Sequence, residues 1–248
     1  MSESLTPRWK RATQFAMLFA TLFPTVAAWG YFLALTGSEG RVNVWQQIAY
    51  TSSKIVQFAF PLAFLAAVEG RLPRPTRPRF TGLTLGLGFG IVVVALMLGL
   101  YFGGLRSSRM LAQTPERVRE KLQEVNVATP ARYALLAVFV VAAHSLLEEY
   151  YWRWFVFGHL RWLMAHKPAI ALSSLAFMAH HIVVLYVYLP GRFWTAALPL
   201  SLAIAVGGAV WAWLYERSGS IYSPWLSHLL VDAGIFVIGW DLLWPING

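Results

Sequence analysis

Runs of predominantly apolar residues, each about 20 residues long or longer, follow one another along the whole chain. An α-helix rises about 1.5 Å per residue, so about 20 apolar residues cross a hydrocarbon core of about 30 Å. The pattern therefore predicts about seven membrane-spanning helices, and six to eight are compatible with it because the ends of the runs are indistinct. The expected spans are 12–36, 46–68, 81–103, 131–157, 168–189, 195–215 and 221–243.

The longest connection, from Gly104 to Pro130, is polar and contains the segment "TPERVREKLQEV". This segment predicts a short helix at the membrane surface, which either covers a cavity mouth or is simply solvated, the second being favoured. The first apolar run is longer than the core of a signal peptide, so it is interpreted as a retained helix. No stretch is long enough for a separate soluble domain, and residues 1–248 are expected to form a single integral membrane domain.

Composition agrees with this interpretation, because 58% of the residues are hydrophobic, 12% are charged and the mean hydropathy is +0.55. These values are typical of an integral membrane protein and predict an all-α, polytopic transmembrane bundle. The chain has no cysteine, which excludes disulfides, thiolate metal sites and a cysteine nucleophile.

A net charge of +9 would suggest nucleic acid as a partner for a soluble chain, but in a membrane protein the position of the basic residues indicates orientation instead. With seven spans, three basic clusters fall on one side of the membrane, which is expected to be cytoplasmic. The N-terminus is then inside and the C-terminus outside, with the lipid bilayer rather than nucleic acid as the surroundings. The clusters are Arg8, Lys10 and Arg11; Arg71, Arg74, Arg77 and Arg79; and Arg161 and Lys167.

Ionisable side chains inside the spans are few, and each costs at least a few kcal/mol at bilayer depth unless it is paired or faces water. The acidic ones are Glu148, Glu149 and Asp232, and the histidines are His144, His180, His181 and His228. All seven belong to the fourth, fifth and seventh apolar runs. An active site is therefore predicted between these three helices.

Helical spacing predicts different surroundings for the two adjacent glutamates, Glu148 and Glu149. Glu149 and Arg153 are four residues apart, so a structural ion pair is the favoured interpretation for them. The Glu148 side chain points about 100° away from that of Glu149 around the helix axis. It shares a face with His144, which could change the pKa of Glu148. It is interpreted as a functional carboxylate rather than a structural one.

The same spacing recurs on the other two helices. His181 follows Phe177 by four residues, which favours it over His180 as the inward-facing imidazole, and His228 and Asp232 lie on one face of the last helix. Together with Glu148 these residues could activate a water molecule, since a carboxylate or imidazole within hydrogen-bond reach can take its proton.

These residues resemble the CPBP family of CAAX-type intramembrane endopeptidases, which includes bacteriocin-processing and Abi proteins. The family pattern EExxxR, FxxxH and HxxxN or HxxxD is present in that order, within residues 148–232. It matches Glu148, Glu149 and Arg153; Phe177 and His181; and His228 and Asp232. The first 125 residues match only as generic membrane helices.

The resemblance implies an intramembrane endopeptidase in which Glu148 and His181 activate water while His228 and Asp232 complete the site. The expected substrate is a membrane-tethered protein, cleaved near its membrane anchor or in its C-terminal tail, and the expected location is the bacterial inner membrane. No cofactor is certain. A metalloprotease mechanism stays open, and zinc would then be bound by Glu148, His181 and His228, although the HExxH signature is absent.

Glu149 and Arg153 are expected to support the site, with His144 and His180 further from the chemistry. Two other functions remain open: a catalytically inactive membrane scaffold or immunity-type protein, and a transporter that uses Glu148 and Asp232 as proton carriers. No repeat or pair of broken helices favours transport. The sequence leaves the oligomeric state undetermined.

Overall fold

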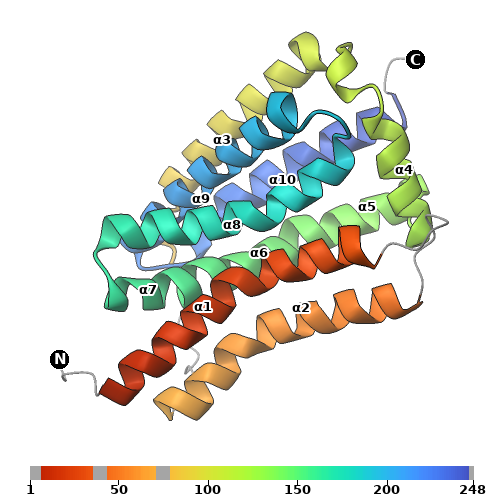
Figure 1. Cartoon of the computed structure of the whole chain (residues 1–248). Coiled ribbons are helices and arrows are strands. Elements are labelled where there is room, and N and C mark those ends of the chain that lie inside the picture. Colours follow the sequence, from red (N-terminus) through yellow and green to blue (C-terminus); the bar gives the residue numbers. More distant parts are fainter. Residues whose placement is uncertain (1–6, 36–43, 71–78, 246–248) are drawn as a thin grey trace.

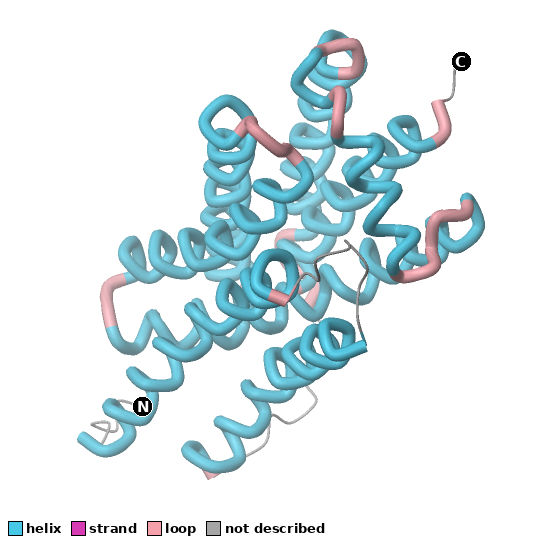
Figure 2. The backbone as a smooth tube through the Cα atoms, turned by 45° about the vertical axis from the view of Figure 1, so that its right-hand side comes forward, coloured by secondary structure: helices cyan, strands magenta, loops and turns pink. Residues whose placement is uncertain are grey.

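The computed structural model describes residues 7–35, 44–70 and 79–245, and every regular element in these ranges is a helix (Figures 1 and 2). Seven helices are long and apolar enough to cross a membrane, which confirms the predicted polytopic bundle. They are Arg8–Ala34, Val44–Glu69, Leu83–Leu105, Pro130–Leu163, His166–Tyr188, Phe193–Ser218 and Tyr222–Leu243. Arg71, Arg74 and Arg77 of the second basic cluster lie outside the described residues.

The first three spans each combine an α-helix with a short π-helical end. They are α1 (Pro7–Trp29) with η1 (Gly30–Ala34), α2 (Val44–Phe64) with η2 (Leu65–Glu69), and α3 (Leu83–Leu100) with η3 (Tyr101–Leu105). The polar link then forms η4 (Arg109–Leu111) and α4 (Thr114–Glu124), which confirms a short helix there. One face of α4 packs against α8 and α10, and the other is exposed.

The fourth span is one long helix with two π-helical interruptions, and in Figure 1 it lies between α1 and α2 on one side and the last three spans on the other. It comprises α5 (Pro130–Val138), η5 (Phe139–His144), α6 (Ser145–Glu149), η6 (Tyr150–Phe157) and α7 (Gly158–Leu163). The predicted end at residue 157 was wrong. His159 is buried in the next turn, where it hydrogen bonds the Phe155 carbonyl and the Glu69 carboxylate, so the helix continues to Leu163.

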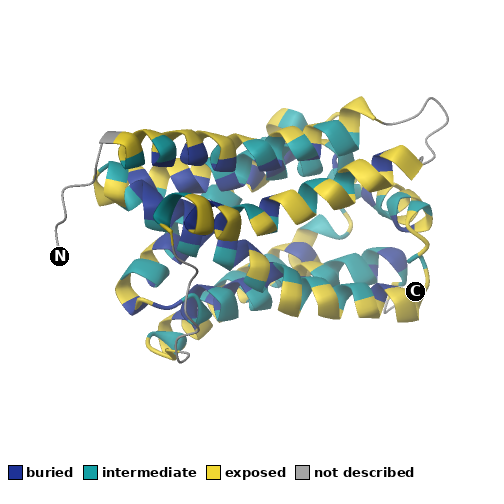
Figure 3. Ribbon diagram, turned by 90° about the horizontal axis from the view of Figure 1, so that it is seen from below, coloured by how far each residue is buried: buried dark blue, intermediate teal, exposed yellow. Residues whose placement is uncertain are grey.

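The last three spans are α8 (His166–Tyr188), η7 (Phe193–Ala197) with α9 (Leu198–Ser218), and α10 (Tyr222–Leu243). α8 packs along α9, α10 packs along α3, and α1 crosses α8. Large apolar side chains on the outer faces are exposed, while the buried ones lie between the helices (Figure 3). An exposed apolar exterior of this extent suits contact with lipid rather than water.

Helix α10, which carries two of the motif residues, lies unusually close to α3 because α3 presents glycines to it. A Cβ atom at Gly86 would lie 2.1 Å from the Ser223 carbonyl oxygen, and one at Gly90 would lie 3.1 Å from the Ser227 Cα atom. Small residues allow such close contact between membrane helices. The glycines therefore fix the position of His228 relative to the rest of the bundle.

We expect Gly86→Ala to lower the stability of the protein by about 1–3 kcal/mol, because the added methyl group forces α3 and α10 apart. The thermal unfolding midpoint in detergent would measure the loss. Gly88→Ala is the matched control, because a Cβ atom there meets nothing within 4 Å. Equal melting of the two variants would contradict the proposed close contact.

Candidate active site

The predicted site residues of the fourth, fifth and seventh spans meet in the interior of the bundle. Glu148 and Glu149 lie in the short α6 segment between the two π-helical stretches, and both are buried. π-Helical turns are rare and often occur at functional sites. Here they flank the two glutamates directly, with His144 ending η5 and Arg153 lying in η6.

The Glu149 carboxylate contacts two side chains through the same oxygen atom. Its Oε1 atom lies 3.1 Å from Arg153 Nη1, the ion pair expected from the spacing, and 2.7 Å from Nδ1 of His228 on α10. The carboxylate can only accept, so the His228 Nδ1–H donates this bond. The cross-helix contact was not predicted, because the sequence pattern relates Glu149 only to neighbours on its own helix.

The fixed orientation of His228 directs its other nitrogen, Nε2, towards two more carboxylates. It lies 3.7 Å from Glu148 Oε2 and 3.6 Å from Asp232 Oδ1. These separations are longer than a direct hydrogen bond, and polar atoms at such distances are commonly bridged by a small group such as water. The structure thus places His228, Glu148 and Asp232 close together.

Both histidines of α8 lie near Glu148, but they differ in their surroundings. His180 is buried, its Nε2 atom is 3.8 Å from Glu148 Oε1, and its ring is stacked on Trp152. His181 is half-buried, and its Nδ1–H donates to the Phe177 carbonyl at 2.8 Å. Because that bond places the hydrogen on Nδ1, the Nε2 atom of His181 keeps a free lone pair.

His144 is less closely tied to the site. Its ring packs edge-to-face against Phe58 of α2, with 6.1 Å between ring centroids. It is near enough to Glu148 for an electrostatic interaction, yet among the described residues it forms no ion pair with Glu148 at 4.0 Å or less.

Aromatic rings enclose the buried charges. The Arg153 guanidinium carbon lies 4.6 Å from the Phe177 ring centroid and 5.0 Å from that of Trp211 on α9, which favours a cation over the ring faces. Trp211 also stacks on His228 at 4.2 Å. The sequence pattern led us to interpret the tryptophans as general packing residues, so Trp211 was missed. Its only indication in the sequence is that it lies on a helix between two motif helices.

The arrangement of the motif residues gives no direct support to a metal centre. In the part of the chain that the structure describes, no group of three or more His, Asp or Glu side chains has a geometry that could hold a metal ion. The zinc set implied by the resemblance, Glu148, His181 and His228, stays a prediction, and no step of the proposed reaction is assigned to a metal.

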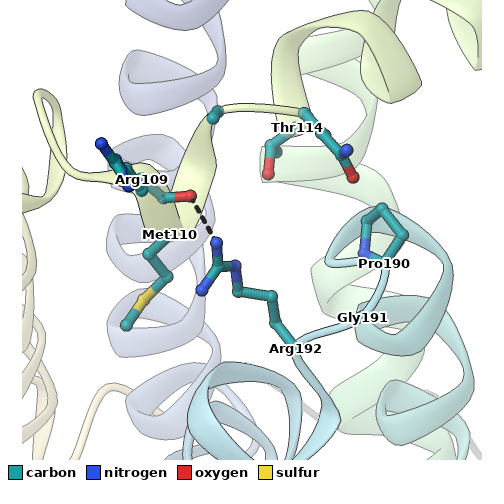
Figure 4. A pocket seen from close by; sticks show the side chains of 8 residues that line it. Arg109, Met110, Thr114, Pro190, Gly191 and Arg192 are labelled. Atoms are coloured by element: carbon teal, nitrogen blue, oxygen red, sulfur yellow. Dashed lines mark hydrogen bonds between the residues drawn. The ribbon is translucent and has the colours of Figure 1, made fainter.

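A cavity of about 750 Å³ lies elsewhere, where the η4–α4 link meets the connection from α8 to η7 (Figure 4). Arg192 donates to the Arg109 carbonyl at 3.0 Å across it. It contains none of the motif residues, so it is separate from the buried site. Its lining is Arg109, Met110, Ala112, Gln113, Thr114, Pro190, Gly191 and Arg192.

Fold and site together define a polytopic membrane protein with an acid–histidine cluster inside the bundle. The profile of the family described as "type II CAAX prenyl endopeptidase Rce1-like" matches residues 130–234. The matched region contains all three motifs, which confirms the resemblance to the CPBP/CAAX protease family. The match implies a membrane-embedded hydrolase of the protease class. No curated protein and no solved structure matches the chain.

We expect Arg153→Met to destabilise the protein by about 3–5 kcal/mol, because it removes the cation that neutralises the fully buried Glu149. Thermal unfolding in detergent is the measurement. The double variant Glu149→Gln with Arg153→Met should recover part of the loss, since no unpaired charge is then buried.

The matched control is Arg117→Met, which breaks the half-exposed Arg117–Glu120 pair on α4. Exposed pairs contribute about 0–1 kcal/mol, so this variant should melt close to the wild type. Similar losses for Arg117→Met and Arg153→Met would contradict the structural role given to the buried pair.

Proposed function

We propose that the chain is an intramembrane endopeptidase in which Glu148 activates a water molecule that attacks a peptide bond. The observation that carries the proposal is the position of Glu148, a buried carboxylate whose two oxygens lie 3.7 Å from His228 Nε2 and 3.8 Å from His180 Nε2, with His181 next to His180 on α8. A water between these groups has both an acceptor for its proton and donors to orient it.

In the proposed reaction, Glu148 takes a proton from water while the oxygen forms a bond to the peptide carbonyl carbon. His181 orients this water, because its Nε2 lone pair can accept a hydrogen bond and its half-buried ring is the more accessible of the two on α8. The C–N bond then breaks, and Glu148 returns the proton to the departing nitrogen. No other reactant is needed.

His228 is proposed to stabilise the negative oxygen of the tetrahedral intermediate. Its Nδ1–H is bound to Glu149, so Nε2 is the atom available to the substrate, and a proton on Nε2 would donate to the oxyanion. Asp232, 3.6 Å from Nε2, favours that protonated form by its charge. An ionised Asp232 would itself repel the oxyanion, so its proposed role is to favour the protonated form of His228 and not to contact the substrate.

The proposed substrate is a peptide bond near the membrane anchor or in the C-terminal tail of a membrane-tethered protein, and the proposed location is a bacterial inner membrane. The seven spans support a cytoplasmic N-terminus, since Arg8, Arg79, Arg161 and Lys167 then lie at the same end of the bundle. The catalytic cluster is within the spans, which suits a substrate held in the bilayer.

We expect Glu148→Gln to lower hydrolysis of membrane-anchored peptides by roughly 10²–10⁴-fold, because the amide cannot take a proton from water. Purified protein in liposomes, with a library of anchored peptides and mass-spectrometric detection of products, would measure the rates. Glu120→Gln, at a half-exposed carboxylate on α4, is the control and should keep the wild-type rate. Equal cleavage by all three proteins would exclude Glu148 as the base.

The two histidines of α8 should differ in the same assay. His181→Asn is expected to abolish most activity because the shorter amide cannot place an acceptor where the imidazole Nε2 lies, whereas His180→Asn is expected to leave a measurable rate by preserving His181. Thermal unfolding of both variants controls for loss of the fold. A larger loss of activity in a well-folded His180→Asn protein would transfer the proposed role to His180.

A further inference from the structure

A lysine lies inside the second membrane span, outside the region that matches the family. Lys54 is ten residues from the start of α2 and fifteen from the end of its span at Glu69. At about 1.5 Å per residue it is roughly 15 Å from one end and roughly 22 Å from the other, too deep for its side chain to reach water easily at either end. An ammonium group at this depth costs several kcal/mol unless something compensates it.

The described residues around Lys54 give it only neutral partners. Its Nζ atom donates to Gln57 Oε1 at 3.1 Å and lies 5.7 Å and 5.8 Å from the ring centroids of Tyr50 and Phe58. No described carboxylate lies within 4.0 Å of it. The half-buried ammonium group is thus held in place without a direct ion pair among the described residues, and the carboxylate that acts on it electrostatically, Glu148, does so from beyond 4.0 Å.

Lys54 lies near the candidate active site. Phe58, one of its ring partners, packs against His144, and Lys54 interacts electrostatically with His144, Glu148 and His180. The path from Nζ through the Phe58 ring to His144 consists of contacts of 5.8 Å and 6.1 Å. An extended peptide covers about 3.3–3.6 Å per residue, so a few residues beyond the scissile bond would reach from the site to Lys54.

We propose that Lys54 binds a carboxylate of the substrate peptide, an inference that rests on the proposed endopeptidase function. A peptide supplies this group from two sources, its C-terminal carboxylate or an Asp or Glu side chain near the cleaved bond. A charged hydrogen bond in this low-dielectric setting is strong and offsets the cost of burying the ammonium group. Lys54 would then select substrates that carry an anion at a fixed distance from Glu148.

The test uses the full-length protein in liposomes and anchored peptides that differ only in the anion. One pair ends in a free acid or an amide, and a second, amidated pair carries Asp or Asn after the cleaved bond. We expect the wild type to cleave one of the anionic peptides at least tenfold faster than its neutral counterpart, and the pair that responds identifies the source of the carboxylate.

Lys54→Met should cleave both members of that pair at the wild-type rate for the neutral peptide, and Lys54→Arg should keep most of the preference. Lys167→Met removes an exposed lysine at the start of α8 and should behave as the wild type. Cleavage of the neutral peptides by Lys54→Met shows that the fold and the catalytic residues are intact.

Three results would overturn the proposal: equal cleavage of both pairs by the wild type, a preference that persists in Lys54→Met, or no cleavage of any peptide. The first two leave the endopeptidase function in place and remove only the role of Lys54. The third removes the proposed function as well, so the two failures are distinguishable.

Discussion

The site depends on one buried carboxylate, that of Glu149, which is fully buried among helices and yet has two partners. Its contact with Arg153 neutralises its charge, and its hydrogen bond with His228 ties α6 to α10. Removing Arg153 leaves the charge of Glu149 uncompensated in a medium that cannot solvate it, and removing Glu149 leaves both the Arg153 charge and the His228 Nδ1–H group unsatisfied. The orientation of His228, and with it the distances to Glu148 and Asp232, follows from this arrangement.

Phe177 explains why a motif that ends in histidine begins with phenylalanine. Its ring lies over the Arg153 guanidinium and packs edge-on against His228, and its carbonyl fixes the Nδ1 hydrogen of His181. The residue therefore connects the three motif helices through one ring and one backbone atom. A smaller apolar side chain would fill less of this space and offer no ring face to the cation.

Much of the fold could be predicted from the sequence, because crossing a bilayer requires about 20 apolar residues whatever the packing. The three helices of the site followed from the rarity of charges within those runs. The π-helical stretches of the fourth span could not be predicted, since periodicity arguments assume 3.6 residues per turn. The bond between Glu149 and His228 joins residues 79 apart in the sequence, a relation that helical spacing does not contain.

Lys54 could have been identified from the sequence, because it is the single charged residue in the apolar run 46–68. It was not considered as a candidate. Glu148, Glu149 and Asp232 were identified because only acidic residues and histidines within the spans were considered, whereas the same energetic argument applies to a lysine in any span. The N-terminal helices also contact the catalytic span directly: the Tyr151 hydroxyl donates to the Ala20 carbonyl of α1 at 2.8 Å, and Phe64 of α2 packs on Phe155. The helices α1 and α2, which lie outside the family match, thus pack against the span that carries Glu148, and under the proposed function a cation on them is suited to select the peptide rather than to cleave it.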